Sequence, residues 1–313
     1  MGGVKRIVVV VCVLASLVAT ACKADSKKKS PAVATPAFTV ATTTTQLTEW
    51  AKVIGGDTVT VHGLLKANVD PHDFEPTPAD LKHIADADVI VKNGLGLEKW
   101  FDDTMKNSGS KAFVVDASAN VITQKADGLP AADDNHDADP HIWQNPLWAR
   151  VMVHNMALAF ERKDPKHANA YARRATAYEK KLVALDAEII AKLTPITNRK
   201  VVTNHDAFGY YLTHYRFQLV GSVIPSFDTQ AELSAKDVSA LVAKIKATKV
   251  KAVFAEAALP AKTAEAIAKE AGVKVVAGAD SLYGDSLGPA GSEGETYIGA
   301  LRHNTKVFVD NLV

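Results

Sequence analysis

The chain has 313 residues, of which 47% are apolar, and its 36 basic residues nearly balance its 35 acidic residues. This length suits one large or two medium-sized folded domains, and the ordinary apolar fraction excludes a wholly disordered or coiled-coil protein. The formal net charge of +1 gives no electrostatic reason to expect nucleic acid as a partner.

The N-terminus has the pattern of a secretory signal. Lys5 and Arg6 precede an apolar run over residues 7–18, and small residues follow before Cys22. The run is shorter than the roughly 20 residues that a membrane-spanning helix needs. We therefore expect residues 1–21 to be a signal peptide.

Cys22 resembles the lipidation site of bacterial lipoproteins, although Ala19 stands where leucine is usual. We expect Cys22 to carry lipid, which would anchor the mature chain to the cell membrane on its extracytoplasmic side. An ordinary signal with an incidental cysteine would instead give a secreted or periplasmic soluble protein. Cys12 lies inside the signal, so the mature chain has no second thiol for a disulfide. Residues 22–37 are polar and basic and contain proline, which predicts a flexible, lipidated tether.

From residue 38 onward, short β-branched runs alternate with helical patterns. We predict strands, in chain order, at residues 38–41, 59–62, 89–91, 112–115, 200–203, 218–221, 252–255 and 273–277. We predict helices beside them at residues 45–54, 78–86, 98–107, 206–214, 233–246 and 260–271. Alternation of this kind predicts parallel sheets that are covered by helices.

Between the two halves lies a long stretch without a strand pattern. Residues 146–161 fit one helix, and residues 168–193 fit a second helix that would be roughly 40 Å long. The predicted fold class is therefore α/β, with two lobes, each a mostly parallel four-stranded sheet flanked by helices, joined by one long rigid helix. We expect an N-terminal lobe over 38–164, a linking helix over 165–195 and a C-terminal lobe over 196–313.

The tripeptide Asp-Pro-His occurs twice, at residues 70–72 and 139–141. Each copy follows a predicted strand of the first lobe after a polar loop. In the second lobe, His205 follows the strand 200–203, and Asp280 follows the last predicted strand. Ligands of open α/β sheets bind at the carboxyl ends of the strands, so these residues can converge if the lobes face one another.

His72, His141, His205 and Asp280 form a donor set that suits zinc. Imidazole nitrogen and carboxylate oxygen are the usual ligands of Zn²⁺ where thiolate is absent, and four such groups complete a tetrahedral site. Manganese prefers oxygen-richer surroundings, so the set favours zinc. Most other histidines are interpreted as ordinary surface or core residues: His62, His83, His154, His167, His214 and His303.

These residues resemble a known family, the metal-binding solute-binding lipoproteins of bacterial ABC importers for zinc and manganese. Beside the two Asp-Pro-His motifs, the matching segments are residues 93–100, 204–211 and 253–256. The resemblance covers about residues 38–313 and implies two lobes with the metal in the cleft between them. It also implies an ABC permease as partner, and the ligands of the family map onto the four side chains named above.

The third ligand separates the subgroups of that family, because zinc proteins generally have His there and manganese proteins generally have Glu. His205 therefore favours the zinc-type subgroup. In place of the long His-rich loop of many zinc members, the chain has an acidic stretch over residues 127–139. His136 in this stretch is a candidate accessory ligand, with a solvated loop as the alternative. Glu256 is a candidate partner of the ligands, with a surface carboxylate as the alternative.

We therefore predict an extracytoplasmic zinc receptor that delivers Zn²⁺ to an ABC permease and is not an enzyme. We expect a monomer that does not bind nucleic acid, and a periplasmic or extracellular metallochaperone is a further candidate partner. Binding should weaken as the pH falls through about 6–6.5, because protonated imidazole cannot ligate a metal.

Two kinds of alternative stay open. A manganese or iron receptor would have the same architecture. An additional role as an adhesin is a further alternative, and nothing in the sequence tests it. A zinc-dependent hydrolase belongs to another class: its zinc would have three protein ligands, and Asp280 would be a general base. No dinucleotide fingerprint, phosphate loop, His-Glu-x-x-His helix or nucleophile elbow is present in the sequence.

Overall fold

The structure, a computed structural model, describes residues 1–3, 36–125, 128 and 138–313. The predictions for Cys22 and His136, and those for most of the signal peptide, the tether and the acidic stretch, lie outside these residues. Thr35–Val313 form one compact unit. Within the described ranges, no helix is long and apolar enough to cross a membrane.

The first sheet has four parallel strands in the order β2-β1-β3-β4. Their bounds are β1 Phe38–Thr42, β2 Val59–Gly63, β3 Val89–Lys92 and β4 Phe113–Asp116. Alternate side chains point to opposite faces, as the period of two in a strand requires. In β3, Val89 and Val91 join the central core, whereas Ile90 joins a second core on the other face. This double burial explains why β3 begins with the continuously apolar run Val-Ile-Val.

The second sheet repeats the same connectivity, with parallel strands in the order β6-β5-β7-β8. Their bounds are β5 Lys200–His205, β6 Gln218–Ile224, β7 Ala252–Phe254 and β8 Lys274–Val276. Val201 and Phe254 face the central core, whereas Val202 and Val253 face a separate core. The fold class predicted from the sequence, two lobes with parallel four-stranded sheets, is confirmed.

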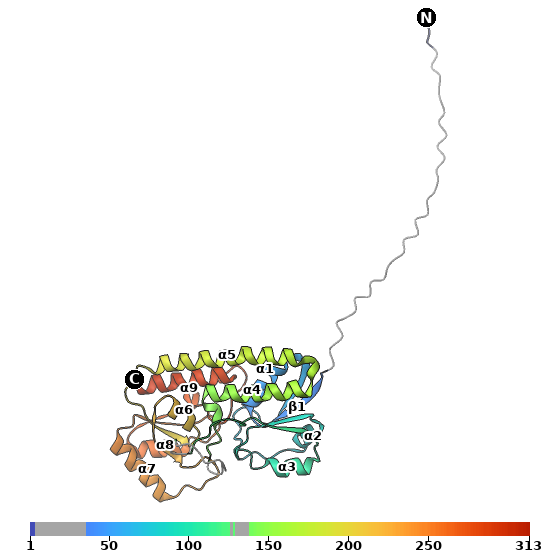
Figure 1. Cartoon of the computed structure of the whole chain (residues 1–313). Helices are drawn as coiled ribbons and strands as arrows, with labels where there is room; N and C mark the ends of the chain where they lie inside the picture. Colours follow the sequence, from blue (N-terminus) through green and yellow to red (C-terminus); the bar gives the residue numbers. More distant parts are fainter. Residues whose placement is uncertain (4–35, 126–127, 129–137) are drawn as a thin grey trace. The chain divides into compact units, whose positions relative to one another are not determined.

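Helices cover both faces of the two sheets. Their bounds are α1 Thr45–Gly55, α2 Pro78–Asp86, α3 Phe101–Ser108, α4 Pro146–Lys163, α5 Ala168–Leu193, α6 Gly209–His214, α7 Ala235–Thr248, α8 Lys262–Ala271 and α9 Tyr297–Leu312. Figure 1 shows α1, α4, α5 and α9 together along one side of the two sheets, with α2, α3, α7 and α8 on the other.

Helix α5 joins the two lobes and contacts both. Its buried residues recur every three or four positions, which places them on one face: Tyr171, Ala175, Tyr178, Leu182, Leu185, Ile189 and Leu193. Near its start, Arg174 Nε donates to Ile54 O of α1 over 2.6 Å. Nearer its end, Asp186 accepts from Tyr215 Oη over 2.8 Å. At about 1.5 Å per residue the helix is roughly 39 Å long, so it holds the lobes along one side.

The C-terminal helix α9 has no counterpart among the predicted elements, because residues 278–313 received none. Thr296 caps its N-terminus by accepting from Gly299 N over 3.1 Å. Phe308 is fully buried, and its ring contacts the rings of Tyr211 and Phe254. The helix therefore completes the core of the C-terminal lobe against α5.

Element boundaries near the cleft differ from the expected ones. Strand β5 runs two residues further than predicted and ends at His205 itself, and α6 begins only at Gly209. Pairing of His205 with Ile224 of β6 accounts for the extension. The division into lobes at residues 164 and 195 stays a prediction, because the folded residues form one compact unit.

Candidate metal centre

Four buried side chains, two from each lobe, converge: His72, His141, His205 and Asp285. One ligand atom from each lies within 4.8 Å of all the others. His205 Nε2 is 3.2 Å and His72 Nε2 is 3.5 Å from Asp285 Oδ2, and His141 Nε2 is 3.4 Å from Asp285 Oδ1. His72 is 9% exposed and the other three are at most 1% exposed.

The two Asp-Pro-His motifs fold in the same way. Asp70 Oδ1 accepts from the backbone N–H of His72 over 2.8 Å, and Asp139 Oδ1 accepts from that of His141 over 2.9 Å. Such an aspartate turn, with proline fixing the middle φ angle, presents the histidine from a loop without a helix beneath it. The repeated motif therefore has a local structural cause as well as a chemical one.

Carboxylates fix the ring orientation of two of the histidines. Asp139 Oδ1 also accepts from His141 Nδ1 over 2.8 Å, within a fully buried pair. Glu256 Oε1 accepts both from the backbone N–H of His205, over 3.0 Å, and from its Nδ1, over 2.7 Å. A proton held on Nδ1 leaves the lone pair on Nε2 directed at the centre of the group. Glu256 is buried, so the surface alternative for this residue does not apply.

The fourth member of the group is Asp285, and the structure corrects the expectation for Asp280. Asp280 is exposed, ends the short 3-10 helix η4, Gly278–Asp280, and is not among the four converging side chains. The chain then returns beside β7, where Leu282 bridges to Glu256. Only after this bridge does it reach the three histidines at Asp285.

The loop that carries Asp285 is held from several sides. Gly284 O accepts from Trp143 Nε1 over 2.9 Å and from Gln144 Nε2 over 2.8 Å. Gln46 Nε2 of α1 donates to Asp285 O over 3.1 Å. A Cβ atom on Gly284 would lie 2.0 Å from Glu256 Oε2, so the close approach requires glycine there. These contacts fix the carboxylate without using its own oxygen atoms.

Sequence reasoning missed Asp285 because it stands nine residues beyond the end of β8, outside any periodic pattern. The rule that ligands follow strand ends favoured the nearer aspartate. The pair Gly284-Asp285 is no distinguishing signal, because Gly56-Asp57 and Gly294-Glu295 have the same pattern.

Burial and the neighbouring charges shift the pKa values of these side chains in opposite directions. Burial lowers the pKa of His72 to about 4, against the opposing effect of Asp285. Burial alone would also lower the pKa of His205, but the carboxylates of Glu256 and Asp285 raise it well above its ordinary value. Burial raises the pKa of Asp285, yet the neighbouring histidines, His205 first, bring it below its ordinary value. The carboxylate of Asp285 is therefore ionised beside three histidine rings, and such a carboxylate suits a bound cation.

Several buried polar atoms at the centre have no hydrogen-bond partner. His205 Nε2 and both carboxylate oxygens of Asp285 are such atoms. Buried polar atoms without partners are costly, and a metal ion coordinated by them would remove that cost. The aromatic rings of Trp143 and Phe227 lie beside His141, with centroids 5.3 and 6.1 Å away. They form dry walls that keep the local dielectric low.

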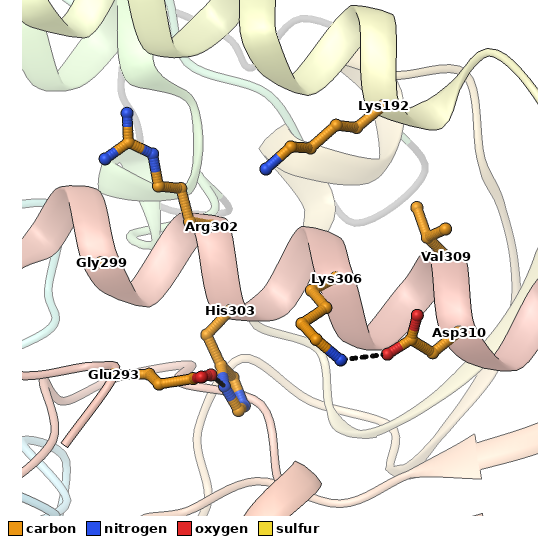
Figure 2. A pocket seen from close by; sticks show the side chains of 8 residues that line it. All are labelled: Lys192, Glu293, Gly299, Arg302, His303, Lys306, Val309 and Asp310. Carbon is orange, nitrogen blue, oxygen red and sulfur yellow. Dashed lines mark hydrogen bonds and ion pairs between the residues drawn. The ribbon is translucent and has the colours of Figure 1, made fainter.

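A separate cavity of about 540 Å³ lies between α5 and α9, away from this group. Figure 2 shows Lys192 and Arg302 reaching toward it from the two helices and Lys306 beside its partner Asp310. Glu188 pairs with Lys192 and with Arg302. Lys192, Arg302 and Lys306 are thus each paired, so among the described residues that line this cavity none of these cations is left to select an anionic ligand.

The comparisons with known proteins agree with the geometry. The family model described as zinc-uptake complex component A, periplasmic (ZnuA) matches residues 40–311. The chain belongs to the ZnuA family. This family comprises substrate-binding proteins of ABC transporters, so the protein is a metal-binding receptor of that class and not an enzyme, and the hydrolase alternative falls.

Relatives of the chain are named for different metals. The manganese-binding lipoprotein MntA of Bacillus subtilis is 32% identical over 305 residues, which cover 95% of this chain and 96% of the relative. The iron-binding protein YfeA of Yersinia pestis is 31% identical over 287 residues, which cover 90% and 88%. Other relatives are named metal or iron ABC transporter substrate-binding lipoproteins.

Among solved structures, the periplasmic zinc binding protein TroA from Treponema pallidum is similar to this chain with a TM-score of 0.80 and 28% identity. The match covers 88% of this chain and 99% of TroA. Membership of the ZnuA family therefore establishes the fold and the class of cargo, a divalent metal ion, but these names do not single out zinc.

Proposed function

We propose that this protein captures Zn²⁺ outside the membrane, in the cleft between its lobes, and delivers it to the permease of an ABC importer. The observation that carries the proposal is the convergence of three imidazole nitrogens and one carboxylate, buried and within 4.8 Å of one another. His72, His141, His205 and Asp285 would be the ligands. Two come from each lobe, so release of the ion would require the lobes to separate.

The choice of zinc rests on the donor atoms. Three nitrogens and one carboxylate suit a tetrahedral Zn²⁺ ion, whereas Mn²⁺ prefers more oxygen donors. Glu256 is a carboxylate near the group, but its Oε1 accepts two hydrogen bonds from His205 and thereby orients that histidine. The names of MntA and YfeA favour a manganese or iron receptor as the second candidate.

Anchoring by a lipid on Cys22 is part of the proposal. The sequence pattern before Cys22 supports it, and so does the word lipoprotein in the names of MntA and other relatives. The tether of residues 22–37 would then link the membrane to the folded lobes. A monomeric state and delivery by a metallochaperone remain predictions.

The experiment that tests the function is metal uptake by cells that lack this protein. Cells that carry the wild-type chain should accumulate zinc from medium with trace zinc and manganese, and cells that carry His205→Ala should not. Uptake is the better readout because affinity in solution follows the general metal series and not the transported ion. Restoration of manganese or iron uptake, with zinc uptake unchanged, would contradict the choice of zinc.

A further inference from the structure

The segment that carries Asp285, residues 281–293, which we call the Asp285 loop, is bound to helix α9 by two neighbouring side chains. Asn304 Nδ2 donates to Tyr283 O over 2.8 Å, and Asn304 Oδ1 accepts from Tyr283 N over 2.8 Å. Asn304 is fully buried. One side chain thus pairs with both polar backbone groups of a residue two positions before Asp285, and this pairing sets the orientation of the backbone there.

His303, the preceding residue of α9, holds two further points of the same loop. Its Nδ1 donates to Glu293 Oε2 over 2.8 Å, and its Nε2 donates to Ser281 O over 3.0 Å. Figure 2 shows Glu293 beside this ring. Ser281 and Glu293 are the first and last residues of the Asp285 loop. Helix α9 therefore holds the loop at both ends and at Tyr283.

The inside of the loop is closed around the ring of Tyr283. A Cβ atom on Gly288 would lie 2.8 Å from this ring, and one on Gly294 would lie 2.3 Å from it. Because glycine at both positions lets the chain close around the ring, a movement of Tyr283 would move the loop with it. A cavity of about 390 Å³ borders Tyr283, Glu293 and His303. Part of the boundary between the loop and α9 is therefore not filled by side chains, and hydrogen bonds hold the two together there.

The N-terminal lobe holds the next part of the loop. Gly284 O accepts from Trp143 Nε1 over 2.9 Å, and Asp285 O accepts from Gln46 Nε2 over 3.1 Å. The backbone therefore passes from contacts with α9 to contacts with the N-terminal lobe between Tyr283 and Gly284. Among the described residues, the carboxylate oxygens of Asp285 have no hydrogen-bond partner of their own. Their position depends on these backbone contacts.

We propose that Asn304, together with His303, is a positioning residue of the metal centre, because it fixes the backbone at Tyr283 so that the carboxylate of Asp285 faces the three histidine rings. Neither side chain belongs to the converging group of four, and both act through the Asp285 loop. The inference rests on the proposed function, because it takes Asp285 as a ligand. A metal site requires its ligands to stay within about 0.5 Å of the productive geometry, so a small turn of this backbone would weaken binding.

The test compares Asn304→Leu with Thr305→Val in the mature chain. Asn304→Leu is nearly isosteric and removes both hydrogen bonds to Tyr283. Thr305→Val removes the hydroxyl of the next residue, which is also fully buried and bonds with Leu301 O and Tyr211 Oη in the core. Each variant loses two buried hydrogen bonds of α9, so the pair separates an effect on the loop from a general loss of stability.

The readouts are zinc affinity, measured by competition titration, and the visible absorption of bound Co²⁺, which depends on the number and geometry of its ligands. Asn304→Leu should weaken zinc binding about tenfold, as loss of an outer partner of a metal ligand does. It should also change the Co²⁺ spectrum, because the carboxylate is displaced. Thr305→Val should match the wild type in both readouts. Wild-type values for Asn304→Leu, or equal changes in the two variants, would overturn the inference.

A second variant and a second measurement decide the remaining cases. If Asn304→Leu does not fold, His303→Leu removes the other two anchors and should weaken zinc binding in the same direction, and an unchanged affinity would overturn the inference. Failure of the wild-type chain to bind one Zn²⁺ would instead contradict the proposed function. Hydrogen exchange of the metal-free chain then decides the inference. The amides of residues 281–293 should exchange about tenfold faster in Asn304→Leu than in Thr305→Val, and equal rates would overturn it.

Discussion

Asp139 and Glu256 hold their histidines through the same two hydrogen bonds, one from the backbone N–H and one from Nδ1. The two arrangements come from different lobes and different local structures, a turn in one case and a strand end in the other. In both, a carboxylate oxygen fixes the ring so that Nε2 faces the centre. At the scale of residues, therefore, two buried carboxylates orient two of the candidate ligands.

The assignment of the fourth ligand gives the sharpest prediction at this scale. Asp285→Asn should weaken zinc binding by more than ~100-fold, because loss of a ligand costs more than the 10–100-fold that loss of an outer partner costs. Asp280→Asn is the matched control, with the same chemical change five residues away on an exposed turn, and it should bind zinc as the wild type does. Competition titration with a fluorescent chelator measures both, and equal losses would contradict the assignment.

Glu256 should matter through the ring that it orients. Glu256→Gln should weaken zinc binding by roughly 10-fold or more, because the amide is a weaker acceptor for the proton on His205 Nδ1. Glu270→Gln changes an exposed carboxylate of the same lobe and should have no effect. Circular dichroism should show both variants folded, and an unchanged zinc affinity for Glu256→Gln would remove this residue from the site.

Zinc affinity should rise with pH, and the rise should extend to higher pH than the range of about 6–6.5 expected from ordinary histidines. Glu256 and Asp285 raise the pKa of His205 well above its ordinary value, so the free site holds a proton there at neutral pH. Zinc must displace that proton, and affinity then falls by up to about tenfold for each unit of pH below that pKa. Dissociation constants at pH 6, 7 and 8 test the sign, and an affinity that is flat across this range would contradict it.

At the scale of elements, α5 and α9 form a continuous helical layer along both lobes, and the central core runs beneath it. Helix α5 was recognisable from its length and its spacing of apolar residues. Helix α9 was not, because its buried face includes the polar residues His303, Asn304 and Thr305, which interrupt the apolar period. Those side chains are buried by tertiary contacts: Asn304, for example, exchanges two hydrogen bonds with the backbone of Tyr283.

The contribution of α9 can be measured through Phe308. Phe308→Ala should lower the free energy of unfolding by about 3–5 kcal/mol, because the ring is fully buried against other aromatic rings and the cavity cannot close. Ile190→Ala on α5 removes an apolar side chain that is 52% exposed, and it should cost much less. Urea unfolding compares the two variants, and similar losses would show that α9 does not complete the core.

At the scale of the molecule, patterns local in sequence predicted most of the fold and three of the four side chains at the centre. The strands and helices can be recognised from the spacing of apolar residues within each segment, and the Asp-Pro-His motif forms its turn from its own three residues. The fourth side chain depended on the path of the loop after β8, which passes through η4 and the bridge between Leu282 and Glu256 before it reaches Asp285. That path is set by distant partners such as Gln46 and Trp143, which no local pattern contains.

The central claim is that both lobes contribute to one zinc ion. Anomalous diffraction at the zinc absorption edge, from crystals of the zinc-loaded mature chain, tests it most directly. The account predicts a single strong peak at about 2.0–2.2 Å from an Nε2 atom of each of His72, His141 and His205 and from an oxygen of Asp285. A principal peak beside Asp280, or one bound by a single lobe, would contradict it.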